Sequence, residues 1–116
     1  VSINLIGGEV DAERQAVHGT MSTEHIRRYQ ADKAFLGVGG ISLDKGLSAV
    51  SEKEAEMTLS MAASAQVTYL LCDSSKLGKD KYLTFAPLTL VNVLITDEQS
   101  SEIIQAFTNA GVKVLH

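Results

Sequence analysis

VTYLLCDSSKLG, at residues 67–78, is the stretch that decides the fold of this chain. Its apolar first half, rich in β-branched and aromatic residues, predicts a buried strand from Val67 to Cys72. The strand then stops at a polar loop with one acid, two hydroxyls and one lysine: Asp73, Ser74, Ser75 and Lys76. Ligands of open α/β sheets bind beyond the carboxyl ends of the strands, so this loop is a candidate binding site.

A second stretch, KAFLGVGGIS at residues 33–42, has the same design. It predicts a strand from Lys33 to Val38 that leads into a loop containing Gly37, Gly39 and Gly40. Glycine lets backbone N–H groups approach a phosphate closely, because a Cβ atom would stand in the way. The spacing of these glycines differs from the dinucleotide fingerprint G-x-G-x-x-G, so a dinucleotide site is not indicated. Together, the two loops predict a pocket for an anionic ligand.

The rest of the chain alternates between helix and strand patterns. Ser51 and Glu54 have capping-box spacing, which predicts a helix from Ser51 to about Ala65. The other expected elements are a helix from about Thr20–Ser22, a helix capped by Asp97 and ended by Gly111, and strands at Ser2–Ile6, Tyr82–Phe85, Asn92–Thr96 and Lys113–Leu115. This order predicts an α/β fold: a mostly parallel sheet with helices on both faces.

Length and composition narrow the class of protein. The 116 residues suffice for one domain with a real core, and no apolar run approaches the ~20 residues that would cross a bilayer. The chain shows no basic leader and has a single cysteine, Cys72, so we expect a cytoplasmic protein without membrane contact. Because it opens on Val1 in an apparent strand, we also expect it to be part of a longer polypeptide.

Charge and side-chain spacing argue against several functions. The net charge of −4, with scattered lysines and arginines, disfavours direct binding of nucleic acid by this segment. The three histidines lack metal-ligand spacing, and Cys72 is more typical of a small core residue than of a nucleophile. We therefore expect no metal, no cofactor and no catalytic residue, although Asp44 or Glu56 would be the least poor candidates for a general base.

Each candidate loop also has a purely structural interpretation. Asp73, Ser74 and Ser75 are common turn formers, and Lys76 could simply be solvated. Likewise, the glycines could form a dense turn between two strands. These interpretations and the binding hypothesis stay open at the level of local sequence.

The ordered blocks of the chain resemble the C-terminal effector domain of DeoR-type bacterial transcriptional regulators. The resemblance rests on LIGG at 5–8, HG at 18–19, ADKAFLGVGGIS at 31–42, GL at 46–47, EAE at 54–56, LLCDSSKLG at 70–78 and LITD at 94–97. It covers essentially the whole chain in order, which makes it far more specific than any single block.

The resemblance implies a fold, a ligand and an arrangement of the parent protein. The family's effector domain is similar to ribose 5-phosphate isomerase and senses a phosphorylated sugar, and an N-terminal helix-turn-helix domain binds operator DNA. It places Gly37, Gly39, Gly40, Asp73, Ser74, Ser75 and Lys76 in the phosphosugar pocket, and it implies a homo-oligomer. It also implies that residues 1–116 form one effector-binding and oligomerisation domain, which lacks the family's first strand-loop segment and the DNA-binding domain.

Two alternatives to a sensor remain. The first is an enzyme of the sugar-phosphate isomerase type, but Gly39 stands where family members often have an acid, at a position of the isomerases' catalytic loop. The second is a structural oligomerisation module with a vestigial pocket. The sequence favours the sensor, most often a repressor in this family.

Overall fold

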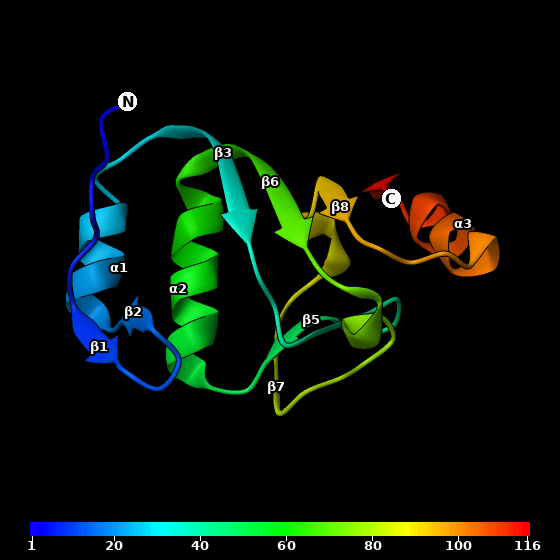
Figure 1. The fold of residues 1–116 in the computed structure, drawn as a ribbon, viewed down its shortest axis with the longest axis horizontal. Coiled ribbons are helices and arrows are strands. Elements are labelled where there is room, and N and C mark those ends of the chain that lie inside the picture. Colours follow the sequence, from blue (N-terminus) through cyan, green and yellow to red (C-terminus); the bar gives the residue numbers. More distant parts are fainter.

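The computed structural model describes all residues from Val1 to His116, and its centre is a four-stranded parallel sheet (Figure 1). The strand order is β3-β6-β8-β9, with bounds Ala31–Leu36, Ala65–Leu71, Val93–Ile95 and Lys113–Leu115. All three pairings are parallel. The predicted α/β class with a parallel sheet is therefore confirmed.

Helix α2, Glu52–Ala63, connects the first two strands of this sheet. The Ser51 side chain accepts a hydrogen bond from the Glu54 amide at 3.2 Å, as the capping-box pattern predicts. The last helix, α3, spans Ser101–Asn109 and connects β8 to β9. Its N-cap is Ser100, whose side chain accepts from the Ile103 amide at 3.3 Å, so the prediction that Asp97 caps this helix was wrong.

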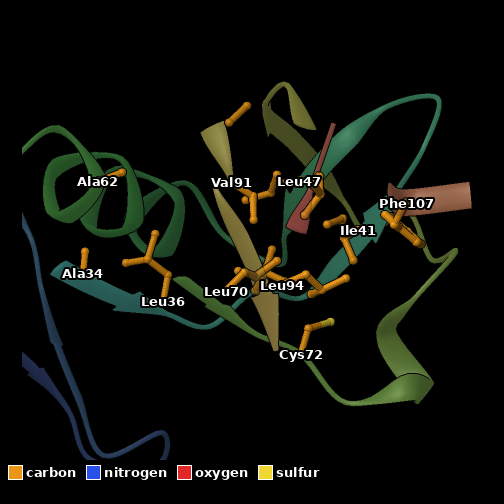
Figure 2. Packing of buried hydrophobic residues seen from close by; sticks show 13 residues of the cluster. Ala34, Leu36, Ile41, Leu47, Ala62, Leu70, Cys72, Val91, Leu94 and Phe107 are labelled. Atoms are coloured by element: carbon orange, nitrogen blue, oxygen red, sulfur yellow. The ribbon is translucent and has the colours of Figure 1, made fainter. Parts of the chain in front are cut away.

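The hydrophobic core lies on one face of the parallel sheet. Alternate strand residues Ala34, Leu36, Leu70 and Leu94 are buried there, and Figure 2 shows Ala62 of α2 and Phe107 of α3 in the same cluster. Both helices thus cover the same face. This follows from the topology, because right-handed crossovers that step in one direction along a sheet all lie on one side of it.

No helix covers the opposite face of the sheet, which is exposed in part, so the expectation of helices on both faces is wrong for this chain. Phe35, Leu71 and Leu115 point away from the core and are 53%, 47% and 43% exposed. The rings of Phe35 and Tyr69 stack there at 5.0 Å between centroids. The prediction of helices on both faces failed because these strands are nearly continuously apolar, which is the pattern expected of strands that are covered on both faces.

A second, antiparallel sheet follows the carboxyl edge of the first. It has the order β4-β5-β7, with bounds Gly40–Ser42, Gly46–Ala49 and Leu83–Ala86. Strand β7 confirms the strand predicted near Tyr82–Phe85, and Pro87 follows it directly. Strands β4 and β5 were not predicted, since their glycine-rich sequence is typical of a loop.

The N-terminal part packs beside α2. It consists of a hairpin, β1 Glu9–Asp11 and β2 Ala16–His18, followed by helix α1 at Thr20–Ile26. The predicted strand at Ser2–Ile6 does not form, and residues 1–7 have no regular structure. The remaining elements are two short 3-10 turns, η1 Ser74–Lys76 and η2 Leu88–Leu90. None of the helices is both long and apolar enough to span a membrane.

Candidate functional site

The two candidate loops leave neighbouring strands at the same edge of the sheet. Strands β3 and β6 are parallel, with Leu36 paired to Leu70, so the segments after them begin side by side. One segment is the glycine stretch from Gly37, and the other begins at Cys72. The topology therefore brings the two sequence-predicted groups to one edge.

Beyond that edge the two segments are joined by backbone contacts. Ile41 and Leu77 form a parallel bridge, and the Gly78 amide donates to the Ile41 carbonyl oxygen at 2.7 Å. The buried Ser48 hydroxyl accepts from the Lys81 amide at 2.8 Å and donates to the Gly40 carbonyl oxygen at 3.3 Å. The loop after β6 is thus held against the glycine segment along much of its length.

The three glycines of this segment have different surroundings. A Cβ atom on Gly40 would collide with the carbonyl oxygen of Lys79, so the close packing of the two segments requires glycine there. The Gly39 amide already donates to the Ser48 carbonyl oxygen at 3.0 Å. Gly37, by contrast, is exposed and has nothing within 4 Å of its Cβ position. Of the three, Gly37 is the one with free space beside it.

Asp73 stabilises its own turn. Its carboxylate accepts from the Ser75 amide at 2.9 Å and also from the Ser75 hydroxyl. These hydrogen bonds, with a smaller attraction from Lys76, lower the pKa of Asp73 below its usual value. The acid is therefore held as a carboxylate that shapes η1.

The loop after β8 also reaches this edge. The Asp97 carboxylate accepts from the Ser74 amide at 2.7 Å, and the Cys72 amide donates to Ile95 at 3.0 Å. Three consecutive strand ends are thus tied together. Asp97 was missed as part of this cluster because an Asp before a helical pattern reads as a cap.

Lysines gather on the loop after β6. No carboxylate lies within 4.0 Å of the ammonium groups of Lys76, Lys79 or Lys81, since the side-chain ion pairs of this chain all involve Arg14, His18 or Lys53. The carboxylate of Asp80 accepts a hydrogen bond from Ser42 at 2.6 Å. Lys79 and Lys81 were not among the predicted site residues, although three lysines within six positions were a visible signal.

The site residues border an open edge. Five surface hollows of about 370 to 660 Å³ lie elsewhere, and none of them is lined by any of the seven predicted residues. Lysine ammonium groups and hydroxyls on one loop suit an anionic group.

The structure gives no support to nucleophilic chemistry at Cys72. Burial raises the pKa of its thiol to about 11, so the thiol is protonated at neutral pH. Asp44 and Glu56, the weak general-base candidates, are both exposed, the first in the turn between β4 and β5 and the second on α2. No group of three or more potential metal ligands occurs in the chain.

Comparison with known proteins gives this arrangement a family. Residues 1–98 match the family described as the DeoR C terminal sensor domain. The chain belongs to this family. The ordered resemblance seen in the sequence is thereby confirmed, and the open edge with its lysines is part of a DeoR sensor domain.

Curated relatives of this DeoR sensor domain are transcriptional regulators. The HTH-type transcriptional repressor GlcR of Bacillus subtilis is 33% identical over 84% of this chain and 37% of its own length. The putative aga operon transcriptional repressor of Escherichia coli O157:H7 is 27% identical over 99% of the chain and 43% of its own length. The lactose phosphotransferase system repressor of Staphylococcus epidermidis is 33% identical over 86% and 39%. The chain thus spans less than half the length of these relatives.

Proposed function

We propose that this DeoR sensor domain binds a phosphorylated sugar at the carboxyl edge of β3 and β6 and thereby controls a transcriptional regulator of sugar metabolism. The observation that carries the proposal is the junction of the two loops. The glycine segment and the lysine-bearing loop are joined at Ile41 and Leu77, next to cations that have no acidic partner.

The chemistry of the edge suits a phosphoryl group. Lys76 offers a compact positive charge and Ser74 offers a hydroxyl group on the same turn, whereas the Ser75 hydroxyl would have to turn away from Asp73 to donate to the phosphate. Gly37 leaves space for close approach by the ligand. The phosphate would pair with the Lys76 ammonium group, which has no acidic partner in this chain. Contacts to the sugar hydroxyls would determine which sugar binds. Gly39, Gly40 and Asp73 would contribute by holding the two loops in place.

The sugar class is supported by the relatives. The names of two of them refer to a lactose phosphotransferase system and to the aga operon. A ribose 5-phosphate isomerase-like fold, a repressor as the parent protein, and operator binding through a separate helix-turn-helix domain belong to the same proposal. Homo-oligomerisation would match the two-fold symmetry of typical operators.

The ligand would act through its differential affinity for two arrangements of the subunits. An effector that binds one arrangement better than the other shifts the balance between them, and typical couplings are about 1–3 kcal/mol. In this proposal the phosphosugar favours the arrangement that does not fit the operator. Neither an enzymatic role nor a purely structural one is favoured by a specific contact at this edge.

A thermal-shift panel on the full-length regulator tests the proposal. Each pentose and hexose phosphate is compared with the same sugar without phosphate, at matched concentration and ionic strength. At a hundred times Kd, a bound ligand adds about 2.7 kcal/mol of stability, which is a readily measured shift. A shift with a phosphorylated sugar and none with its unphosphorylated form is expected. The absence of a shift with every sugar phosphate would reject the proposed ligand class.

A further inference from the structure

Lys81, in the loop after β6, lies against the glycine segment. A Cβ atom on Gly39 would come within 3.2 Å of the Lys81 Cγ atom, so the missing side chain at position 39 makes room for the lysine stem. The backbone of Lys81 is held as well, because its amide donates to the buried Ser48 hydroxyl at 2.8 Å. The stem of this exposed lysine therefore starts from a fixed point and passes Gly39, at the edge that we propose as the effector site.

The loop after β6 meets the glycine segment twice. On the first pass it forms the parallel bridge described above. Gly78, whose φ is +76°, then turns the chain, and on the second pass the Lys79 carbonyl oxygen packs against Gly40. Lys76 precedes the bridge and Lys81 follows the second contact, so the two lysines reach the same segment from different parts of the loop.

The ammonium groups of these two lysines stand at different points of the edge. Burial raises the pKa of Cys72 and hydrogen bonds from Ser75 lower that of Asp73, and the positive charge of Lys76 pulls both pKa values down. The charge of Lys81 acts on neither group. Because such an influence falls with distance, the Lys81 charge lies farther from the end of β6 than the Lys76 charge.

The acids of this edge are bound to neutral donors. Asp73 and Asp97 accept hydrogen bonds from η1, and Asp80 accepts one from β4. No carboxylate lies within 4.0 Å of the ammonium group of Lys76 or of Lys81. Both lysines are therefore cations without an acidic partner.

We propose that Lys81 is a second anion-binding residue of the effector site, and that the effector is a sugar with two anionic groups. This inference rests on the proposed function, in which Lys76 pairs with a phosphoryl group. One phosphoryl group at Lys76 leaves the Lys81 charge without a partner. A second phosphate, or a carboxylate, at another carbon of the same sugar pairs with it and makes the ligand complementary to both charges. Sugar bisphosphates and phosphorylated sugar acids share this chemistry.

Calorimetry on the full-length regulator tests the inference. Each monophosphate of the thermal-shift panel is compared with the bisphosphate and the phosphorylated acid of the same sugar, at matched ionic strength. For glucose, the probes are glucose 6-phosphate, glucose 1,6-bisphosphate and 6-phosphogluconate. One doubly anionic probe should bind about tenfold more tightly than its monophosphate. A preference for the bisphosphate assigns a second phosphate to Lys81, and a preference for the acid assigns a carboxylate.

The failure of this inference differs from the failure of the proposed function. Monophosphates that bind as tightly as the doubly anionic probes, or more tightly, would overturn the inference and leave the proposed function standing. If no probe binds, the proposed function is rejected and the inference falls with it.

Two glutamine variants locate the second anionic group. Lys81→Gln removes the charge and retains a stem beside Gly39, while Lys79→Gln makes the same change at the neighbouring exposed lysine. Only Lys81→Gln should abolish the preference for the doubly anionic probe, with binding of the monophosphate unchanged. If it weakens both probes by the same factor, the two lysines bind one phosphate, and the inference is wrong. Equal effects of the two variants would show a general effect of charge and would also overturn it.

Discussion

The hydroxyl of Ser48 and the backbone of Gly40 form the buried contact on which the proposed site rests. Ser48 is fully buried and donates to the Gly40 carbonyl oxygen at 3.3 Å, while it accepts from the Lys81 amide at 2.8 Å. One side chain of β5 thus positions both the glycine segment and the lysine-bearing loop. This contact makes the geometry of the edge sensitive to residues that touch no ligand.

Replacement of Ser48 by alanine should loosen this edge. The change leaves the Lys81 amide and the Gly40 carbonyl without their buried partner, and an unsatisfied buried polar group costs about 1–3 kcal/mol. Urea unfolding of Ser48→Ala should show a loss of that size. Ser101→Ala, at an exposed position at the start of α3, is the control and should be near neutral. Equal stability of the two variants would mean that the Ser48 contacts contribute nothing.

Gly40→Ala and Gly37→Ala should behave differently. The alanine at position 40 forces the Lys79 backbone away, which typically costs about 1–3 kcal/mol for an overpacked site. The alanine at position 37 meets no atom within 4 Å and should leave the unfolding free energy unchanged. If Gly37 borders the ligand, however, its variant should weaken sugar-phosphate binding. A stable Gly40→Ala protein would show that the two segments are less closely packed than described.

Lys76→Ala should abolish the response to effector while operator binding remains. Charge-assisted hydrogen bonds contribute about 1.5–3 kcal/mol, which corresponds to roughly tenfold to hundredfold weaker phosphosugar binding. Lys113→Ala is the matched control, because Lys113 is exposed at the amino end of β9, on the opposite edge of the sheet. Calorimetry and operator gel shifts on the full-length protein provide the readouts. Unchanged induction in Lys76→Ala would exclude Lys76 from the site.

The turn at Asp73 should respond to acid. Because hydrogen bonds from Ser75 lower the folded-state pKa, the stabilisation is present above the ordinary pKa of 3.8 and is lost as the pH falls through the lowered value. An NMR titration should place the Asp73 inflection below 3.8. In Ser75→Ala the inflection should return towards the ordinary value. An inflection that does not move would mean that Ser75 does not hold this carboxylate.

Cys72 should resist alkylation in the folded protein. Burial raises the pKa of the Cys72 thiol to about 11, so almost no thiolate exists in the folded protein at pH 8. Because the unfolded thiol ionises at lower pH than the folded one, the free energy of unfolding should fall as the pH rises above the ordinary pKa of 9.0. Iodoacetamide should therefore modify the unfolded chain much faster than the native one. Rapid modification of the native protein would contradict the buried position of the thiol.

The parts of the fold that the sequence predicted are those with local signals. The Ser51 side chain accepts from the Glu54 amide within one helical turn, and the strand at Val67–Cys72 agrees with β6 to within two residues. The predicted strand at Ser2–Ile6 has the right alternation, but a strand also needs a neighbour, and this chain supplies none. Alternation cannot reveal whether a partner is present.

The candidate edge was predictable only in outline. Parallel strands that end in polar loops must share an edge, and so Gly37 and Lys76 could be grouped from sequence. The tie between Ser74 and Asp97, and the pairing of Gly40–Ser42 with β5, depend on contacts between distant segments. Such contacts leave no local pattern, which is why Asp97 was assigned to a helix cap and the glycine segment to a loop.

The pairing of β5 with β7 has a consequence for synthesis on the ribosome. Ala86 lies opposite Leu47, so the antiparallel sheet that supports both loops is complete only after residue 86 has left the exit tunnel. A growing polypeptide therefore acquires this edge late. If the edge is the effector site that we propose, a nascent chain cannot bind the effector until most of this segment has been translated.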